Sequence, residues 1–109
     1  MNVQVTPSTG YSVVAVEGRI DTTTAGEFEK SIMEVIEGGC TRLILDCSGL
    51  NYISSSGLRV FLIVQKKMTS IKGQFRLYSL QPGIREIFDI SGFSSIFSVF
   101  PDKDSALKG

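Results

Sequence analysis

The pattern of apolar and polar positions along the chain predicts strands alternating with helices. Short runs rich in Val, Ile and Leu are typical of strands, whereas apolar residues that recur every three or four positions indicate amphipathic helices. Strands are expected at about residues 3–5, 11–18, 43–46, 74–79 and 96–100, and helices at about 24–37, 56–70, 82–89 and 102–107. The predicted element order is therefore β-β-α-β-α-β-α-β-α.

This order favours a single α/β domain with a mixed sheet. The first two strands flank a short turn, Pro7–Gly10, so they are expected to form an antiparallel hairpin with the first strand at an edge. The later strands are separated by helices, which favours parallel pairing. A chain of 109 residues is the size of one domain, so the prediction is one domain over residues 1–109, packed by about four helices.

The most function-like stretch runs from Arg42 to Met68. It opens with an apolar run ending at Asp46, which suits a strand buried on both faces. The next segment, Cys47–Ile53, is predicted to be a turn, and three serines, Ser54–Ser56, follow it. They stand directly before a strongly apolar helix and place a row of hydroxyl groups at its N-terminus.

A second polar junction, Gly18–Thr24, follows the second strand. Thr22, Thr23 or Thr24 is predicted to cap the next helix, and Glu27 is placed to complete a capping box for Thr24. Because the carboxyl ends of parallel strands share one edge of a sheet, the two junctions are expected to form one surface. The polar residues of this surface are Asp21, Thr22, Thr23, Asn51, Ser54, Ser55 and Ser56.

Composition removes several classes of function. Lys and Arg number 11, as do Asp and Glu, so net charge gives no indication of nucleic-acid or anionic-membrane binding. The chain has no His, which excludes histidine metal sites and Ser-His-Asp catalysis.

Cys40 and Cys47 lie at no zinc or redox spacing and are expected to be reduced thiols. With no signal-peptide pattern and no apolar run near the roughly 18 residues of a membrane span, we expect a cytoplasmic protein without cofactor or metal.

The serine row admits several chemical interpretations. A nucleophilic serine needs a base and an oxyanion hole, and the chain lacks both His and a GxSxG turn, so we expect no enzyme. The P-loop lysine is absent as well, which leaves only weak nucleotide binding at a helix N-terminus. Helix capping and a phosphorylation switch both remain open, since a phosphate there would gain about 0.3–1 kcal/mol from the helix dipole.

The segment LILDCSGLNYISSSGLRVFL resembles the signature of STAS domains, the anti-sigma factor antagonist family (SpoIIAA-like). That signature is an apolar strand, Asp-x-Ser, a short turn, and Asp-Ser-Ser-Gly-Leu heading a helix. GRIDTTTAGEFEKSI resembles the family segment after the second strand, and IREIFDISGFSSIFSVFPDKDSAL resembles the closing segment. The resemblance covers nearly the whole chain and implies the STAS fold.

By this resemblance, Ser55 is the phosphoacceptor of an anti-sigma factor that is also a serine kinase. The unmodified antagonist binds that kinase and releases the sigma factor; phosphorylation abolishes binding, and a phosphatase restores it. The chain departs from the pattern at Ser54, where the family has Asp, and this leaves Ser54 and Ser56 as alternative acceptors. The expected partner-binding residues are Asp21, Thr22, Thr23, Asn51, Ser54, Ser56, Gly57 and Arg59.

Two other functions are weighed against this one. A STAS domain can also be an unphosphorylated subunit of a larger signalling assembly or of a transport system. A receiver-like phosphoaspartate domain is disfavoured, because Asp46 has no acidic pair from the first strand and the loop after Tyr78 contains no Lys.

Overall fold

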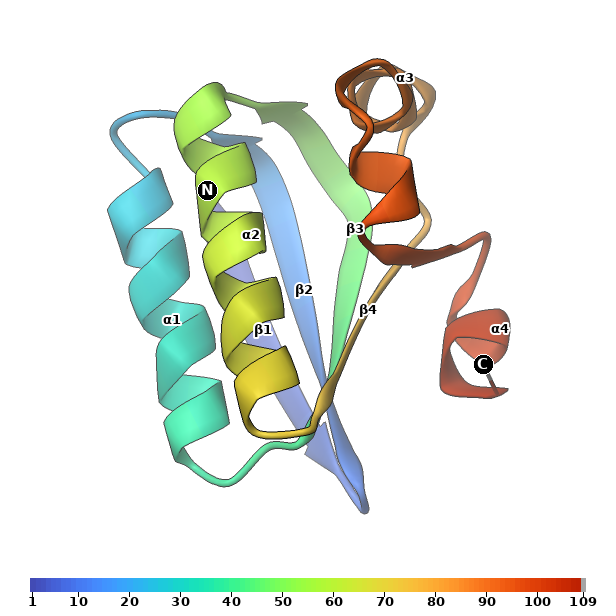
Figure 1. The fold of residues 1–109 in the computed structure, drawn as a ribbon. Helices are drawn as coiled ribbons and strands as arrows, with labels where there is room; N and C mark the ends of the chain where they lie inside the picture. Colours follow the sequence, from blue (N-terminus) through green and yellow to red (C-terminus); the bar gives the residue numbers. More distant parts are fainter. Residues whose placement is uncertain (109) are drawn as a thin grey trace.

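Five strands form one mixed sheet that carries helices on both faces (Figure 1). The computed structural model describes residues 1–108; Gly109, the last residue of the predicted domain, lies outside them. The elements are β1 (Asn2–Ser8), β2 (Tyr11–Ile20), α1 (Ala25–Glu37), β3 (Arg42–Ile53), α2 (Ser55–Ser70), β4 (Gln74–Tyr78), α3 (Pro82–Ser91), the 3-10 turn η1 (Phe93–Ser95), β5 (Ser98–Phe100) and α4 (Lys103–Lys108). The strand order is β1-β2-β3-β4-β5, with β1–β2 antiparallel and the other pairs parallel. The predicted α/β class and element order are confirmed.

The main core lies between the sheet and the helices α1 and α2, which run side by side across one face (Figure 1). Phe61 of α2 is fully buried at its centre. Its ring lies between 5.6 and 6.2 Å from the rings of four other phenylalanines, Phe28, Phe75, Phe88 and Phe97. These come from α1, β4, α3 and the segment before β5. Aromatic packing therefore fixes α2 against elements from most of the chain.

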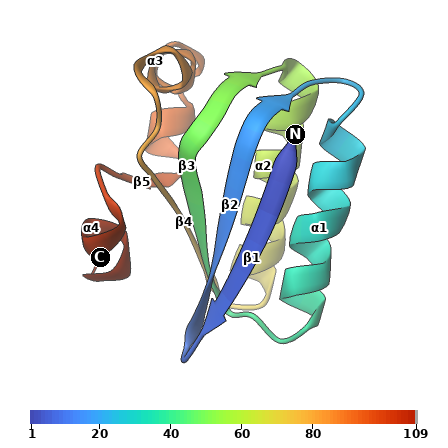
Figure 2. The same ribbon diagram turned by 180° about the vertical axis from the view of Figure 1, so that it is seen from behind.

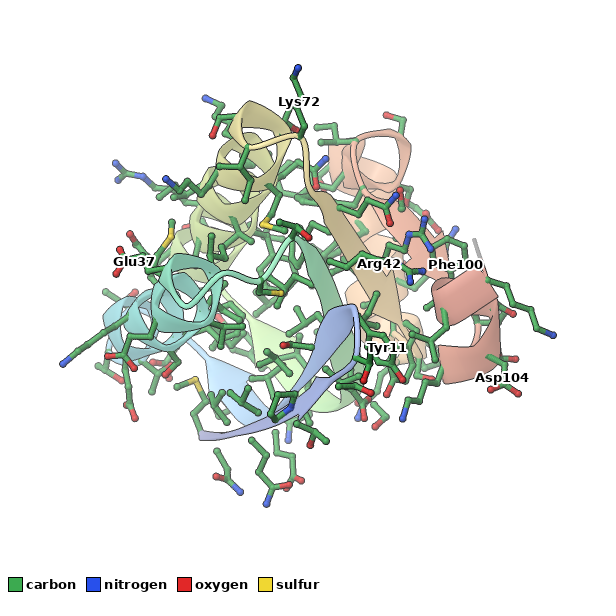
Figure 3. All side chains as sticks on the ribbon, turned by 90° about the horizontal axis from the view of Figure 1, so that it is seen from below. Tyr11, Glu37, Arg42, Lys72, Phe100 and Asp104 are labelled. Carbon is green, nitrogen blue, oxygen red and sulfur yellow. The ribbon has the colours of Figure 1, made fainter. Side chains whose placement is uncertain are left out.

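The opposite face of the sheet is covered in part by α4, which Figure 2 shows from behind. Ile44 points to this face and is buried with Val13, Tyr78 and Ala106. Two arginines hold the end of α4: Arg42 Nη2 donates to the Leu107 carbonyl oxygen at 2.6 Å, and Arg76 Nη1 donates to that of Ala106 at 2.8 Å. Figure 3 shows Arg42 extending from β3 toward α4. Cationic donors suit the C-terminal carbonyls of a helix.

The predicted turn at Cys47–Ile53 is wrong, because β3 continues through it to Ile53. In the pairing with β2, β3 carries an extra residue at two places: Ala15 pairs with Asp46 but Glu17 with Gly49, and Gly18 with Leu50 but Arg19 with Tyr52. These bulges space the buried residues of β3 by three. Cys47, Leu50 and Ile53 are those residues. A search for strict alternation therefore misses the second half of the strand.

Other boundaries also differ from prediction. β1 spans Asn2–Ser8 rather than about residues 3–5, so it extends into the predicted turn. β2 ends at Ile20 rather than Gly18, which has a φ of 92° and lies at the second bulge. α3 extends to Ser91 rather than ending at Asp89. β5 begins at Ser98 rather than Ile96, because η1 occupies the preceding residues. The predicted end of α1 at Glu37 is confirmed.

Candidate functional site

The two polar strand–helix junctions meet at one end of the sheet, as the parallel pairing of β2 and β3 requires (Figure 1). The backbone N–H of Ser54 donates to the carbonyl oxygen of Ile20 at 2.8 Å, and Ile20 pairs with Ile53. Ser54 alone separates β3 from α2. The β3–α2 half of this surface is therefore built from a strand end and the first turn of a helix, in place of the predicted turn.

Ser54 is the N-cap of α2. Its backbone is extended, with φ −88° and ψ 173°, and its Oγ accepts a hydrogen bond from the Gly57 N–H at 3.2 Å. Ser and Asp are both strongly preferred N-caps, because either side chain satisfies an N–H group that the helix leaves free. Ser54 thus fills the capping role that an Asp at this position would also fill.

Gly57 brings α2 close to the strand ends. It is buried, and a Cβ atom there would lie 2.7 Å from Ile53 Cγ1 and 2.8 Å from Ile20 Cγ2. A side chain would therefore push the helix away from β2 and β3. Gly57 is too buried to contact a partner directly. It affects the surface by setting the position of the first turn of α2, which carries the serines.

The other two serines differ in exposure. Ser55 is the first residue of α2 and is exposed to solvent. Ser56 is half-buried and lines a groove of about 380 Å³ between α1 and α2. Arg59, one turn further along α2, is exposed and lines the same groove, whose residues are Ala25, Gly26, Glu29, Ser56, Arg59, Val60 and Ile63.

Asp21 organises the junction after β2. Its Oδ1 accepts hydrogen bonds from the Thr23 N–H at 2.9 Å, the Thr23 hydroxyl at 2.7 Å and the Thr24 N–H at 3.2 Å. The bond from the Thr23 hydroxyl is the main cause that lowers the pKa of Asp21 below its ordinary value. Asp21 is therefore a fixed, ionised carboxylate at neutral pH.

The predicted capping box of Thr24 and Glu27 is wrong. Thr24 is the N-cap of α1, but its side chain makes no capping hydrogen bond to the helix. Its hydroxyl donates to the Arg19 carbonyl oxygen at 3.0 Å instead, on the strand side of the junction. Asp21 Oδ1 accepts a hydrogen bond from the Thr24 N–H, which is the bond that a capping box would give to the Glu27 side chain.

Arg19 and Tyr52 are site residues that sequence reasoning missed. The Arg19 guanidinium lies 4.0 Å from the centroid of the Tyr52 ring, and Arg19 Nε lies 3.9 Å from Asp21 Oδ2. Both residues are exposed. Arg19 and Tyr52 pair across β2 and β3, and knowledge of this pairing would have predicted their contact. The two bulges shift the register, so regular pairing of the strands does not predict it. Thr22 and Asn51, the remaining predicted residues, are also exposed at this end.

A second cavity lies away from this surface. Its volume is about 400 Å³, and it is formed by the β1–β2 turn and the segment that follows α1. No predicted site residue lines it. Within residues 1–108 no helix is long and apolar enough to cross a membrane, and no group of three or more His, Cys, Asp or Glu is placed to hold a metal ion.

The model of the STAS domain family matches residues 1–106. The chain belongs to the STAS domain family. It is 37% identical over 97 residues to BtrV of Bordetella bronchiseptica, whose name describes a candidate anti-sigma factor antagonist; the match covers 89% of this chain and 84% of BtrV. It is 28% identical to the anti-sigma-F factor antagonist RsfB of Mycobacterium tuberculosis, over 100% of this chain and 88% of RsfB.

Similarity of structure extends over the same length. The crystal structure of an anti-sigma factor antagonist from Mycobacterium paratuberculosis superposes with a TM-score of 0.89 at 29% identity. The match covers 98% of this STAS domain and 91% of that chain.

Proposed function

We propose that this STAS domain is an anti-sigma factor antagonist that binds an anti-sigma factor serine kinase and thereby releases a sigma factor. The observation that carries the proposal is the exposed Ser55 at the first position of α2, in a chain 37% identical to BtrV, whose name describes a candidate anti-sigma factor antagonist. The binding surface comprises the Asp21–Thr23 segment, the end of β3 and the first turns of α2. Arg19 and Tyr52 extend it.

Phosphorylation of Ser55 is the switch that turns binding off. The phosphate adds about −1.5 to −2 charges at a helix N-terminus, where the helix dipole stabilises an anion by about 0.3–1 kcal/mol. The fold therefore tolerates the modification, while a partner that packs against the neutral hydroxyl loses complementarity. A phosphatase that removes the phosphate restores binding. In this mechanism the domain is the substrate of the kinase and performs no catalysis itself.

The three serines offer different access to a kinase. The hydroxyl of Ser54 accepts the capping bond from Gly57, so modifying it would disturb the start of the helix. Ser56 is half-buried beside the groove, whereas Ser55 is exposed. A kinase must enclose the hydroxyl that it modifies, and this difference supports Ser55 as the acceptor.

Phosphate transfer tests the proposal. The protein is incubated with ATP and an anti-sigma factor serine kinase, and the modified residue is mapped by mass spectrometry. We expect phosphate on Ser55 in the wild type, no labelling of Ser55→Ala, and retained labelling of the matched control Ser56→Ala. Undiminished labelling of Ser55→Ala would refute the acceptor. An unlabelled wild type would favour a subunit of a larger signalling assembly or transport system instead.

A further inference from the structure

Arg59 stands four residues after Ser55 on α2, and both side chains are exposed. Residues at this spacing are neighbours on a helix surface, with Cβ atoms about 5–6 Å apart. Long helical side chains lean toward the helix N-terminus, so the Arg59 side chain extends over the turn that carries Ser55. The long arginine side chain can span this separation.

Arg59 also forms no ion pair with a carboxylate among the residues that the structure describes. Within residues 1–108 the ion pairs closer than 4 Å are Arg19–Asp21 and Arg85–Asp89. Glu29 lines the same groove as Arg59 but forms no such pair with it. The lysines of α2, Lys66 and Lys67, lie at least 11 residues beyond Ser55, about 16 Å along the helix axis. Arg59 is therefore the cation of α2 within reach of Ser55.

We propose that Arg59 binds the phosphate on Ser55 in an intramolecular ion pair that withdraws its guanidinium from the groove between α1 and α2. This inference rests on the proposed function, since it takes Ser55 as the phosphoacceptor. A guanidinium can bind two phosphate oxygens at once, a geometry that the compact ammonium of lysine does not match. The pair therefore depends on arginine as well as on positive charge.

The ion pair gives the phosphate two effects on partner binding. It places negative charge at the start of α2, and it neutralises a cation at the rim of a groove that also contains Ala25, Val60 and Ile63. The unmodified groove holds one cationic and one acidic side chain, Arg59 and Glu29, so Arg59 is the group in its lining that can attract an acidic side chain of the kinase. After phosphorylation the same groove offers that side chain no counter-charge.

The pairing is tested by the pKa of the phosphate itself. Phosphoserine is installed at position 55 during translation, so no kinase is needed, and its second ionisation, near pH 6 in ordinary phosphoserine, is followed by ³¹P NMR. Arg59 stabilises the dianion, so Arg59→Gln should raise this phosphate pKa by about 0.3 or more relative to wild type. The matched control Lys67→Gln removes an equal charge too far away to contact the phosphate. Arg59→Lys should give an intermediate value.

A rise in Arg59→Gln no larger than that in Lys67→Gln would overturn the proposal. A second readout needs no variant: the Arg59 Nε resonance should shift between the unmodified and the phosphorylated wild type, and an unchanged resonance would also contradict the pair. These results are independent of the proposed function. If no kinase labels Ser55, the proposed phosphorylation switch is wrong, but the measured ion pair still stands. If Ser55 is labelled and no ion pair is measured, only the proposed role of Arg59 is wrong.

Discussion

The backbone N–H of Ser54 donates a hydrogen bond of 2.8 Å to the carbonyl oxygen of Ile20, which joins the start of α2 directly to the end of β2. The predicted binding residues flank this bond, at positions 21–23 on one side and 51–59 on the other. Strand pairing and helix packing set the positions of residues 51–59, whereas residues 21–23 lie in the turn between β2 and α1 and are held by hydrogen bonds to Asp21. Sites built on such elements are held more firmly than sites on loops.

Gly57→Ala should destabilise the protein by about 1–3 kcal/mol, the usual range for an overpacked core. The added methyl group would lie 2.7 Å from Ile53 Cγ1, and α2 must shift to relieve the contact. Unfolding in urea measures the loss.

Gly26→Ala is the matched control for that change. Gly26 also lies in the first turn of a helix, α1, but a Cβ atom there meets nothing within 4 Å. Alanine is the better helix former, so this variant should be unchanged or more stable by up to about 1 kcal/mol. Equal stability of the two variants would show that close packing at Gly57 is not what fixes α2.

Ser54→Ala should lower the free energy of unfolding by about 1 kcal/mol, because it removes the acceptor for the Gly57 N–H. Ser54→Asp keeps an acceptor and places negative charge at the helix N-terminus, so it should be at least as stable as wild type. Ser55→Ala, which removes an exposed hydroxyl, should change stability by less than about 0.5 kcal/mol. If Ser54→Asp is as unstable as Ser54→Ala, the capping role of position 54 is wrong.

Thr23→Val should raise the pKa of Asp21 toward its ordinary value, because the Thr23 hydroxyl is the main cause of the lowered pKa. A carboxyl group with a lowered folded pKa stabilises the protein above its unfolded pKa, and this stabilisation is lost as pH falls through the folded pKa. The stability difference between Thr23→Val and wild type should therefore shrink below about pH 4. NMR titration of the Asp21 carboxyl carbon, with Thr22→Val as control, measures the shift; an unchanged pKa in Thr23→Val would contradict it.

Periodicity predicted most of the fold, because α1, α2 and the first half of β3 follow regular spacings. It failed at Cys47, Leu50 and Ile53, since two bulges against β2 change the spacing of buried residues from two to three. Bulges arise from how two strands pair, and a single strand's sequence does not reveal that pairing.

The candidate site was predicted only in part, because some of its contacts depend on how separate elements pair. The serines and Asp21 were recognisable from the residues beside each junction and from the resemblance to STAS domains. Arg19 and Tyr52 were missed, because their contact depends on register across two strands. The groove beside Arg59 was not predicted either, because its walls come from α1 and α2, which contribute residues more than 25 positions apart.

The central claim is tested most directly by two affinities of the anti-sigma factor kinase. One is for the unmodified protein and the other is for the protein with phosphoserine at position 55. Calorimetric titration of both forms under one ionic strength gives the two dissociation constants. The account predicts that phosphoserine weakens binding by at least about a hundredfold, or about 2.7 kcal/mol, because a dianion replaces a neutral hydroxyl within the contact surface. Equal affinity of the two forms would contradict it.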